Sequence, residues 1–273
     1  MPHPVILLLL AEDSATLEKG FIPIKRKEVP MKTKSRSIQQ IIEEQMQRWQ
    51  LMKTKKVKDK QGVSTITISR EPGSGGRVVA KKLAGKLGFE VFHQEVLLEI
   101  AKRADVSEKL LETLDEKGLT ILEDCISSLV YDRHLWPDEY LKHLMKVIGA
   151  IGEHGRAIIV GRGANFVIPA DNRFRLRIVA PQNIRIANVA RTFDVTAEDA
   201  KRRIIRTESD RRAFIRKYFN ADIADPINYD LVINTGALEL DKAAEAVIAA
   251  LGGYSLKTAS THLSAGRPLV SQS

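Results

Sequence analysis

Residues 66–77 have the sequence Ile66-Thr67-Ile68-Ser69-Arg70-Glu71-Pro72-Gly73-Ser74-Gly75-Gly76-Arg77. A run rich in β-branched residues breaks into a glycine loop, and a helical pattern begins directly after it. The backbone N–H groups of such a loop can converge on an anion, and the positive end of the helix dipole adds to the field there. The stretch therefore predicts a phosphate-binding loop made by Gly73, Ser74, Gly75, Gly76 and Arg77.

The loop differs from a Walker A motif at two positions. The lysine position after Gly75 holds Gly76, and neither of the next two residues carries the hydroxyl that binds Mg²⁺. Arg77 can supply the charge of the missing lysine, although a guanidinium need not reach the same oxygens. The alternative is that Arg77 is a surface arginine in the first helical turn, where its charge opposes the helix dipole.

Strand and helix patterns alternate along the chain from residue 63 onward. Strands are predicted at 63–69, 89–92, 157–160, 174–180 and 229–234, and helical periodicity occupies 77–87, 94–155, 181–193, the basic stretch that follows Thr196, and 239–251. Pro137 is placed in a first helical turn. Strands separated by helices predict an α/β fold, a parallel sheet flanked by helices, with ligands bound at the carboxyl ends of the strands.

Both ends of the chain depart from this alternation. Residues 1–35 are predicted to be a disordered extension, residues 36–62 an amphipathic helix with a charged linker, residues 63–251 the globular domain, and residues 252–273 a disordered tail. The apolar face of 36–52 needs a partner, which is either the domain itself or a second subunit in a homo-oligomer. The apolar run 5–10 is too short to span a bilayer and makes a poor signal peptide, so no membrane association is expected and the cytoplasm is the predicted compartment.

The net charge of +9 raises the question of a nucleic-acid partner. Residues 1–60 carry +6, residues 251–273 carry +2, and the 190 residues between them carry only +1. Basic tails without aromatic residues among the lysines are usually solvated, so nucleic-acid binding is not expected. A salt series tests that alternative, because phosphate contacts weaken steeply with salt.

The polar residue types argue against a metal centre built by the protein. The six histidines are scattered, with no HExxH or paired-cysteine spacing, so no metal-ligating residue is predicted. The single cysteine, Cys125, lies in an apolar helical pattern and is expected to be a buried, inert thiol.

Two further arginine-bearing segments are candidates for phosphate contacts. Arg162 lies in the corner Gly161-Arg162-Gly163 that ends an apolar strand, where its side chain can project over a ligand. Residues 201–217 hold eight basic residues and two acidic ones. Helical i,i+4 ion pairs such as Arg206 with Asp210 account for part of this segment but leave an excess of arginine, which a lid closing on phosphates would explain.

The three motifs together resemble the cytidylate kinase-like family. The residues that carry the resemblance are Ser69-Arg70-Glu71-Pro72-Gly73-Ser74-Gly75-Gly76-Arg77, Gly161-Arg162-Gly163 and Asp225-Pro226-Ile227-Asn228-Tyr229-Asp230-Leu231-Val232-Ile233-Asn234-Thr235. The resemblance implies a P-loop nucleoside monophosphate kinase fold with a helical insertion, an arginine-rich lid, and ATP and Mg²⁺ as cofactors. It also implies that residues 73–77 hold the donor phosphates. The catalytic residues would then be Arg77, Arg206, Asp210 and Arg211, and the acceptor would be bound by His93, Arg162, Arg206 and Asp210.

The chain departs from true cytidylate kinases at five positions. Gly76 replaces the loop lysine, and His93, Glu99, Gly163 and Ala213 stand where those enzymes have an aspartate, an arginine, an aspartate and an arginine. Two hypotheses remain open beside nucleic-acid binding. One is a kinase that moves a phosphoryl group from ATP to a nucleoside monophosphate, CMP being the first guess. The other is a nucleotide-binding module with a degenerate loop and no catalysis.

Overall fold

A five-stranded sheet forms the centre of the protein in a computed structural model that describes residues 37–54, 63–135 and 137–264. The strand order is β2 (Glu90–Phe92), β3 (Ala157–Val160), β1 (Thr65–Arg70), β4 (Arg173–Val179) and β5 (Leu231–Asn234), and every pairing is parallel. The carboxyl ends of all five strands therefore point to one edge of the sheet. The parallel sheet with flanking helices confirms the predicted α/β fold.

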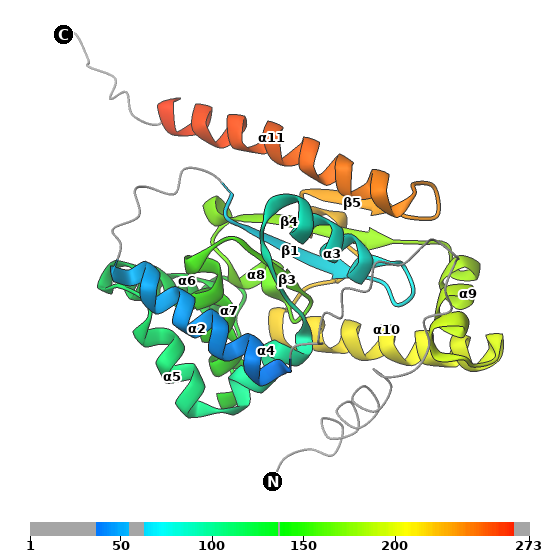
Figure 1. Ribbon diagram of the computed structural model, residues 1–273, viewed down its shortest axis with the longest axis horizontal. Coiled ribbons are helices and arrows are strands. Elements are labelled where there is room, and N and C mark those ends of the chain that lie inside the picture. The colour runs from blue at the N-terminus through cyan, green and yellow to red at the C-terminus, as the bar shows by residue number, and fades with distance from the viewer. Residues whose placement is uncertain (1–36, 55–62, 136, 265–273) are drawn as a thin grey trace, which may run out of the picture.

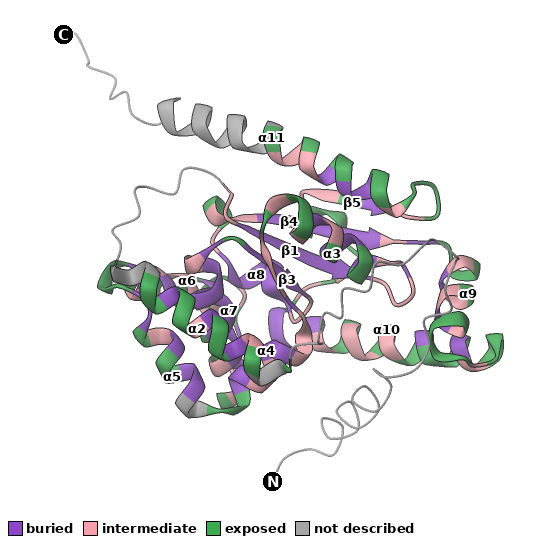
Figure 2. Ribbon diagram, in the orientation of Figure 1, coloured by how far each residue is buried: buried purple, intermediate pink, exposed green. Residues whose placement is uncertain are grey.

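The two faces of the sheet are covered by different sets of helices (Figure 1). On one face, α3 (Gly76–Leu87) and α11 (Leu240–Ser264) pack on Ile66, Ile68 and their neighbours. The other face carries a larger helical group with its own core around Leu144 and Ile148. That group is α4 (Gln94–Lys102), α5 (Ala104–Glu112), α6 (Glu116–Asp132), α7 (Glu139–His154) and the short α8 (Ala164–Val167). Figure 2 shows the buried strands between these two layers.

Two helices that follow β4 form a separate unit at one end of the molecule (Figure 1). These are α9 (Gln182–Phe193) and α10 (Ala197–Phe219), which share a small core of Val189, Ala200 and Ile204. Thr196 caps α10, because its Oγ1 accepts a hydrogen bond from the Asp199 N–H at 3.1 Å. The far end of α10 enters the larger core through Tyr218 and Phe219. The unit thus joins the edge of the sheet to the helical layer.

The first described helix, α2 (Ile38–Thr54), packs on the domain of its own chain. Trp49 is 5% exposed and stacks on Phe92 at 5.9 Å and on His154 at 4.4 Å between ring centroids. Of the two partners that the sequence allows for this apolar face, the domain of the same chain is the one that covers it. A homo-oligomer stays a prediction, and the apolar face of α2 is already covered.

The main difference from the predicted elements lies at the end of the chain. Helix α11 continues to Ser264, whereas the sequence predicts its end near Leu251 and disorder from residue 252. Glycine costs a helix only about 1 kcal/mol per residue, and no proline lies between Leu240 and Pro268, so Gly252 and Gly253 do not end the helix. The predicted extension 1–35 and the linker residues 55–62 lie outside the described residues.

Pro137 also differs from its predicted position. It lies just before Asp138, whose carboxylate accepts a hydrogen bond from the Leu141 N–H at 2.9 Å and so caps α7. Aspartate is a favoured capping residue, and the helix begins only after it.

Within the described residues, no helix combines the length and the apolar character needed to cross a membrane.

Candidate active site

The glycine loop lies at the carboxyl end of β1, the central strand, and opens directly into α3. Gly73 and Gly75 have φ angles of +79° and +76°, in the left-handed region that favours glycine. A Cβ at Gly73 would lie 2.5 Å from the Arg185 carbonyl oxygen, so the loop runs against the backbone of α9. The turn and the helix start that a phosphate loop requires are both present.

Neighbouring elements hold this loop through its own backbone carbonyls. The Ser74 hydroxyl donates to the Glu71 carbonyl at 2.8 Å. Thr235 Oγ1, after β5, donates to the Ser74 carbonyl at 2.7 Å, and Asn188 Nδ2 of α9 donates to the Gly73 carbonyl at 2.9 Å. These bonds use the carbonyls and take up no loop N–H group. The Ser74 N–H donates to the Glu71 carbonyl at 3.2 Å, so the N–H groups at the start of α3 are the ones that an anion would meet.

Arg77 lies in the first turn of α3 and pairs with Glu95 of α4. Its side chain is 53% exposed. Burial alone would raise the pKa of Glu95. The charge of Arg77 and the hydrogen bonds to the carboxylate have the larger combined effect, so the pKa of Glu95 lies below its usual value. The charge of Arg77 is thus partly matched by a carboxylate of the protein itself.

The corner after β3 has three consecutive residues with positive φ, Gly161, Arg162 and Gly163, at +88°, +54° and +71°. This backbone aims Arg162 back over α10, where its guanidinium carbon lies 5.3 Å from the centre of the Phe214 ring. The Nε atom of Arg162 is buried and lacks a hydrogen-bond partner. Orphaned buried donors are rare in folded proteins, so this one is available to a ligand.

His93 follows β2 at the same edge of the sheet, immediately before α4. Its Nδ1 atom is buried without a partner. Burial lowers the pKa of His93, and the nearby charges of Arg77 and Arg70 lower it further. His93 and Arg162 therefore supply two of the three orphaned buried side-chain atoms in the part of the chain that the structure describes, the third being Asn165 Nδ2.

The basic helix α10 contributes one predicted residue directly to the loop. Arg211 Nη1 donates to the carbonyl of Arg70, the last residue of β1, at 2.9 Å. Arg206 is exposed and Asp210 half-buried, and neither side chain makes a hydrogen bond or ion pair with a described residue. The structure thus joins Arg211 to the loop and leaves Arg206 and Asp210 without such a link. Glu208 of α10 pairs with Arg185 of α9 at 2.5 Å.

Comparison with known proteins identifies the family. The model of the cytidylate kinase-like family matches residues 65–237. The chain belongs to the cytidylate kinase-like family.

Curated relatives and one solved structure agree with that family. A cytidylate kinase of Natronomonas pharaonis is 29% identical over 191 residues, covering 69% of this chain and 90% of that protein. Cytidylate kinases of Ignicoccus hospitalis and Sulfolobus acidocaldarius are 25% and 24% identical, covering 68% and 72% of this chain and 97% and 99% of theirs. An uncharacterized protein from Eubacterium ventriosum shares the fold, with a TM-score of 0.52, 22% identity, and coverage of 69% of this chain and 98% of that one. The family and its relatives support a nucleotide kinase function.

The structure explains the departure from true cytidylate kinases at Gly163. A Cβ at Gly163 would lie 2.1 Å from Cε2 of Phe219, which is fully buried at the end of α10. The aspartate of a Gly-Arg-Asp corner therefore cannot stand there while Phe219 keeps its place. Glu99 is half-buried on α4 and Ala213 is exposed on α10, and nothing in the structure explains their identity.

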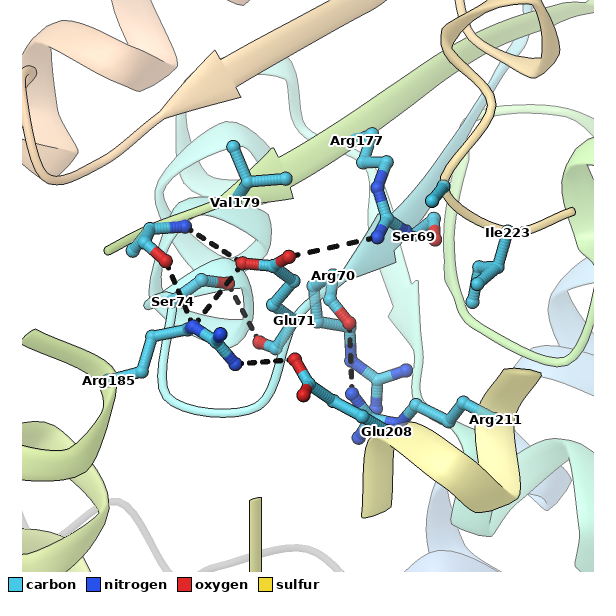
Figure 3. Close-up of polar contacts among 12 residues, drawn as sticks. Ser69, Arg70, Glu71, Ser74, Arg177, Val179, Arg185, Glu208, Arg211 and Ile223 are labelled. Atoms are coloured by element: carbon cyan, nitrogen blue, oxygen red, sulfur yellow. Dashed lines mark hydrogen bonds and ion pairs between the residues drawn. The ribbon is translucent and has the colours of Figure 1, made fainter. Parts of the chain in front are cut away.

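Sequence reasoning missed a network of charged residues beside the loop, drawn in Figure 3. The carboxylate of Glu71 accepts from the Ala180 N–H at 3.1 Å and lies 3.3 Å from Nε of Arg185. Arg185 is 8% exposed and reaches Glu208 of α10 with its Nη1 atom. On the other side, Arg177 donates to the Ser69 hydroxyl at 2.9 Å. The network connects the loop, β4, α9 and α10.

One sequence signal could have indicated part of this network. Residues 173–178 alternate arginine with a large apolar residue, and in a strand this places the three arginines on one face. In the structure Arg175 pairs with Asp230 at 2.7 Å and Arg177 is buried. Arg185 carried no comparable signal, because its partners come from distant parts of the chain.

Proposed function

We propose that this protein transfers the γ-phosphoryl group of ATP to a nucleoside monophosphate, with CMP as the first candidate acceptor. The observation that carries the proposal is the glycine loop at the end of β1, together with arginines from three elements whose charges act at this position. Arg77 comes from α3, Arg162 from the corner after β3, and Arg211 from α10. Phosphoryl transfer depends mainly on positioning and charge neutralisation, and this arrangement offers both.

The reaction needs no nucleophile from the protein. An oxygen of the acceptor phosphate attacks the γ-phosphorus of ATP, the bond from that phosphorus to the β,γ-bridging oxygen breaks, and ADP leaves. The loop N–H groups at the start of α3 would hold the donor phosphates, and the arginines would neutralise the charge that develops on the transferred group. A phosphate acceptor is already ionised near pH 7, so no general base is required.

Mg²⁺ fits this site only as part of the substrate. Among the described residues, no three His, Cys, Asp or Glu side chains form a group that could hold a metal ion, and the loop lacks the hydroxyl of a Walker A motif. Mg²⁺ is commonly bound largely through substrate phosphates and water. MgATP is therefore the donor we propose, in which the ion neutralises phosphate oxygens.

The buried atoms of His93 and Arg162 that lack a hydrogen-bond partner support a binding site for the acceptor at these two residues. Both residues follow strands at the edge that bears the loop, so an acceptor phosphate between them would complete their hydrogen bonds. The names of the curated relatives make CMP the first candidate. The residues His93, Glu99 and Gly163 make a different monophosphate the next candidate to test.

The proposal is tested with the purified full chain, ATP, Mg²⁺ and each common nucleoside monophosphate in turn. We expect ADP formation that depends on one acceptor and falls at least tenfold in Arg162→Met, whose fold is checked by circular dichroism. No ADP with any acceptor would remove the proposal. Tight nucleotide binding without turnover would establish the second candidate, a binding module. Gly76, Glu99 and Gly163 stand where functional side chains are expected, and this favours the second candidate.

A further inference from the structure

The cation and one glycine of a Walker A motif occupy exchanged positions in this loop. With the second glycine of G-x-x-x-x-G-K-[ST] placed on Gly75, the first glycine position holds Arg70 and the lysine position holds Gly76. The positive charge therefore stands at the start of the loop, at the end of β1. The glycine stands at the start of α3.

Contacts between the two positions show that the exchange is coupled. A Cβ at Gly76 would lie 2.7 Å from Cβ of Arg70 and 3.1 Å from its Cγ. The stem of Arg70 thus fills the space through which a lysine side chain would leave position 76. On the other side, a Cβ at Gly161 would lie 2.5 Å from Nη1 of Arg70, so the guanidinium reaches the corner that bears Arg162.

The surroundings of Arg70 contain too little negative charge. The residue is 8% exposed, and its side chain makes no hydrogen bond or ion pair with any residue in the described part of the chain. Burial lowers the pKa of Arg70, and the charges of Arg211, Arg77 and Arg162 lower it further. The carboxylate that opposes them is Glu95, which Arg77 already binds. A buried cation in this position needs an anion that the protein does not supply.

We propose that Arg70 contacts the donor phosphates in place of the loop lysine, reaching them from the strand side of the loop. The inference rests on the proposed function for the identity of the ligand, a nucleoside triphosphate. It assigns to Arg70 the part that the sequence assigned to Arg77. Arg77 is more exposed and paired, whereas Arg70 is buried and unpaired.

The test measures binding of inorganic tripolyphosphate and of ATP by isothermal titration calorimetry. The variants are Arg70→Met and Arg70→Lys, with Arg156→Met as the matched control at the amino end of β3, where Arg156 donates to the Gly88 carbonyl. Charge-assisted hydrogen bonds set the expected loss for Arg70→Met at about 10- to 100-fold in Kd for both ligands. Arg70→Lys should recover part of that loss, and Arg156→Met should change Kd less than about threefold.

A second readout separates ligand contact from a purely structural role. Because Arg70 is a buried cation without a partner, Arg70→Met without ligand should melt at the same temperature as the wild type or higher. A lower melting temperature for the ligand-free variant, or failure of both Arg70→Met and Arg70→Gln to fold, would assign Arg70 to structure and overturn the inference.

The outcomes distinguish this inference from the proposed function. If the wild type binds tripolyphosphate and ATP and Arg70→Met binds them equally well, only the role of Arg70 is wrong. If the wild type binds neither ligand, the proposed function fails and the role of Arg70 fails with it. Loss of binding in Arg70→Met with an intact ligand-free fold supports both.

Discussion

Gly163 is a single residue on which the packing of the corner after β3 depends. It has a φ of +71°, and a Cβ there would lie 2.1 Å from the buried Phe219 ring. Gly163→Ala should therefore lower the free energy of unfolding by about 2–5 kcal/mol, from backbone strain and overpacking together. Urea unfolding measures this change.

Gly85 provides the matched control for that substitution. It lies on an exposed position of α3, and a Cβ there would meet nothing within 4 Å. Gly85→Ala should raise the free energy of unfolding by about 0.5–1 kcal/mol, because alanine is the better helix former. Equal effects of the two substitutions would contradict the described packing of Gly163.

His93 should make stability depend on pH. Its pKa in the folded protein lies below the ordinary value of about 6.5, through burial and the charges of Arg77 and Arg70. As the pH falls below about 6.5, the unfolded chain takes up a proton that folded His93 resists, so the free energy of unfolding decreases. Urea unfolding at pH 7.5 and 5.5 should show a larger decrease for the wild type than for His93→Gln. Equal decreases would mean that His93 titrates normally.

At the scale of elements, Arg185 connects α9 and α10 to the residues at the start of the glycine loop. It is 8% exposed and bonded to both Glu71 and Glu208 (Figure 3). Removing its charge leaves Glu208 without its partner and Glu71 with only the 4.0 Å contact to Arg177 and the Ala180 N–H, so Arg185→Met should lower the free energy of unfolding by roughly 3–5 kcal/mol. Arg202→Met breaks an exposed pair with Asp199 and should change the free energy of unfolding far less, because exposed ion pairs contribute little to stability. Similar costs for both would show that Glu71 and Glu208 do not depend on Arg185.

The docking of α2 is the second prediction at this scale. Trp49 is buried against Phe92 and His154, whereas Leu51 on the same helix is 67% exposed. Trp49→Ala should lower the free energy of unfolding by about 3–5 kcal/mol, and Leu51→Ala should change it by less than about 0.5 kcal/mol. If Trp49→Ala left stability unchanged, α2 would not pack on the domain in solution.

For the whole molecule, patterns along the chain predicted the sheet but not all of its surroundings. The runs at 157–160 and 174–180 have the period and length of buried strands, and β3 and β4 lie at those places. The amphipathic pattern of 36–52 predicted a helix but left open what covers it, because a pattern carries no information on the identity of the partner. The predicted end of α11 near Leu251 is wrong: the Gly-, Ser- and Thr-rich composition after it is typical of a tail, but the helix continues to Ser264.

The candidate site was predictable only in part, for a related reason. The glycine loop and the Gly161-Arg162-Gly163 corner are continuous in sequence, and their backbone angles follow from local residue types. The bridge from Glu71 through Arg185 to Glu208 joins residues up to 137 positions apart. Only the folded chain brings those groups together.

The destination of the γ-phosphoryl group tests the central claim most directly. The full-length protein is incubated with Mg²⁺, ATP labelled with ³²P in the γ-position, and CMP or another monophosphate, and the labelled products are separated. The proposed function predicts label in a nucleoside diphosphate made from the acceptor, and little label in inorganic phosphate. Label that stays in ATP, or appears only as inorganic phosphate with every acceptor, would contradict transfer between nucleotides.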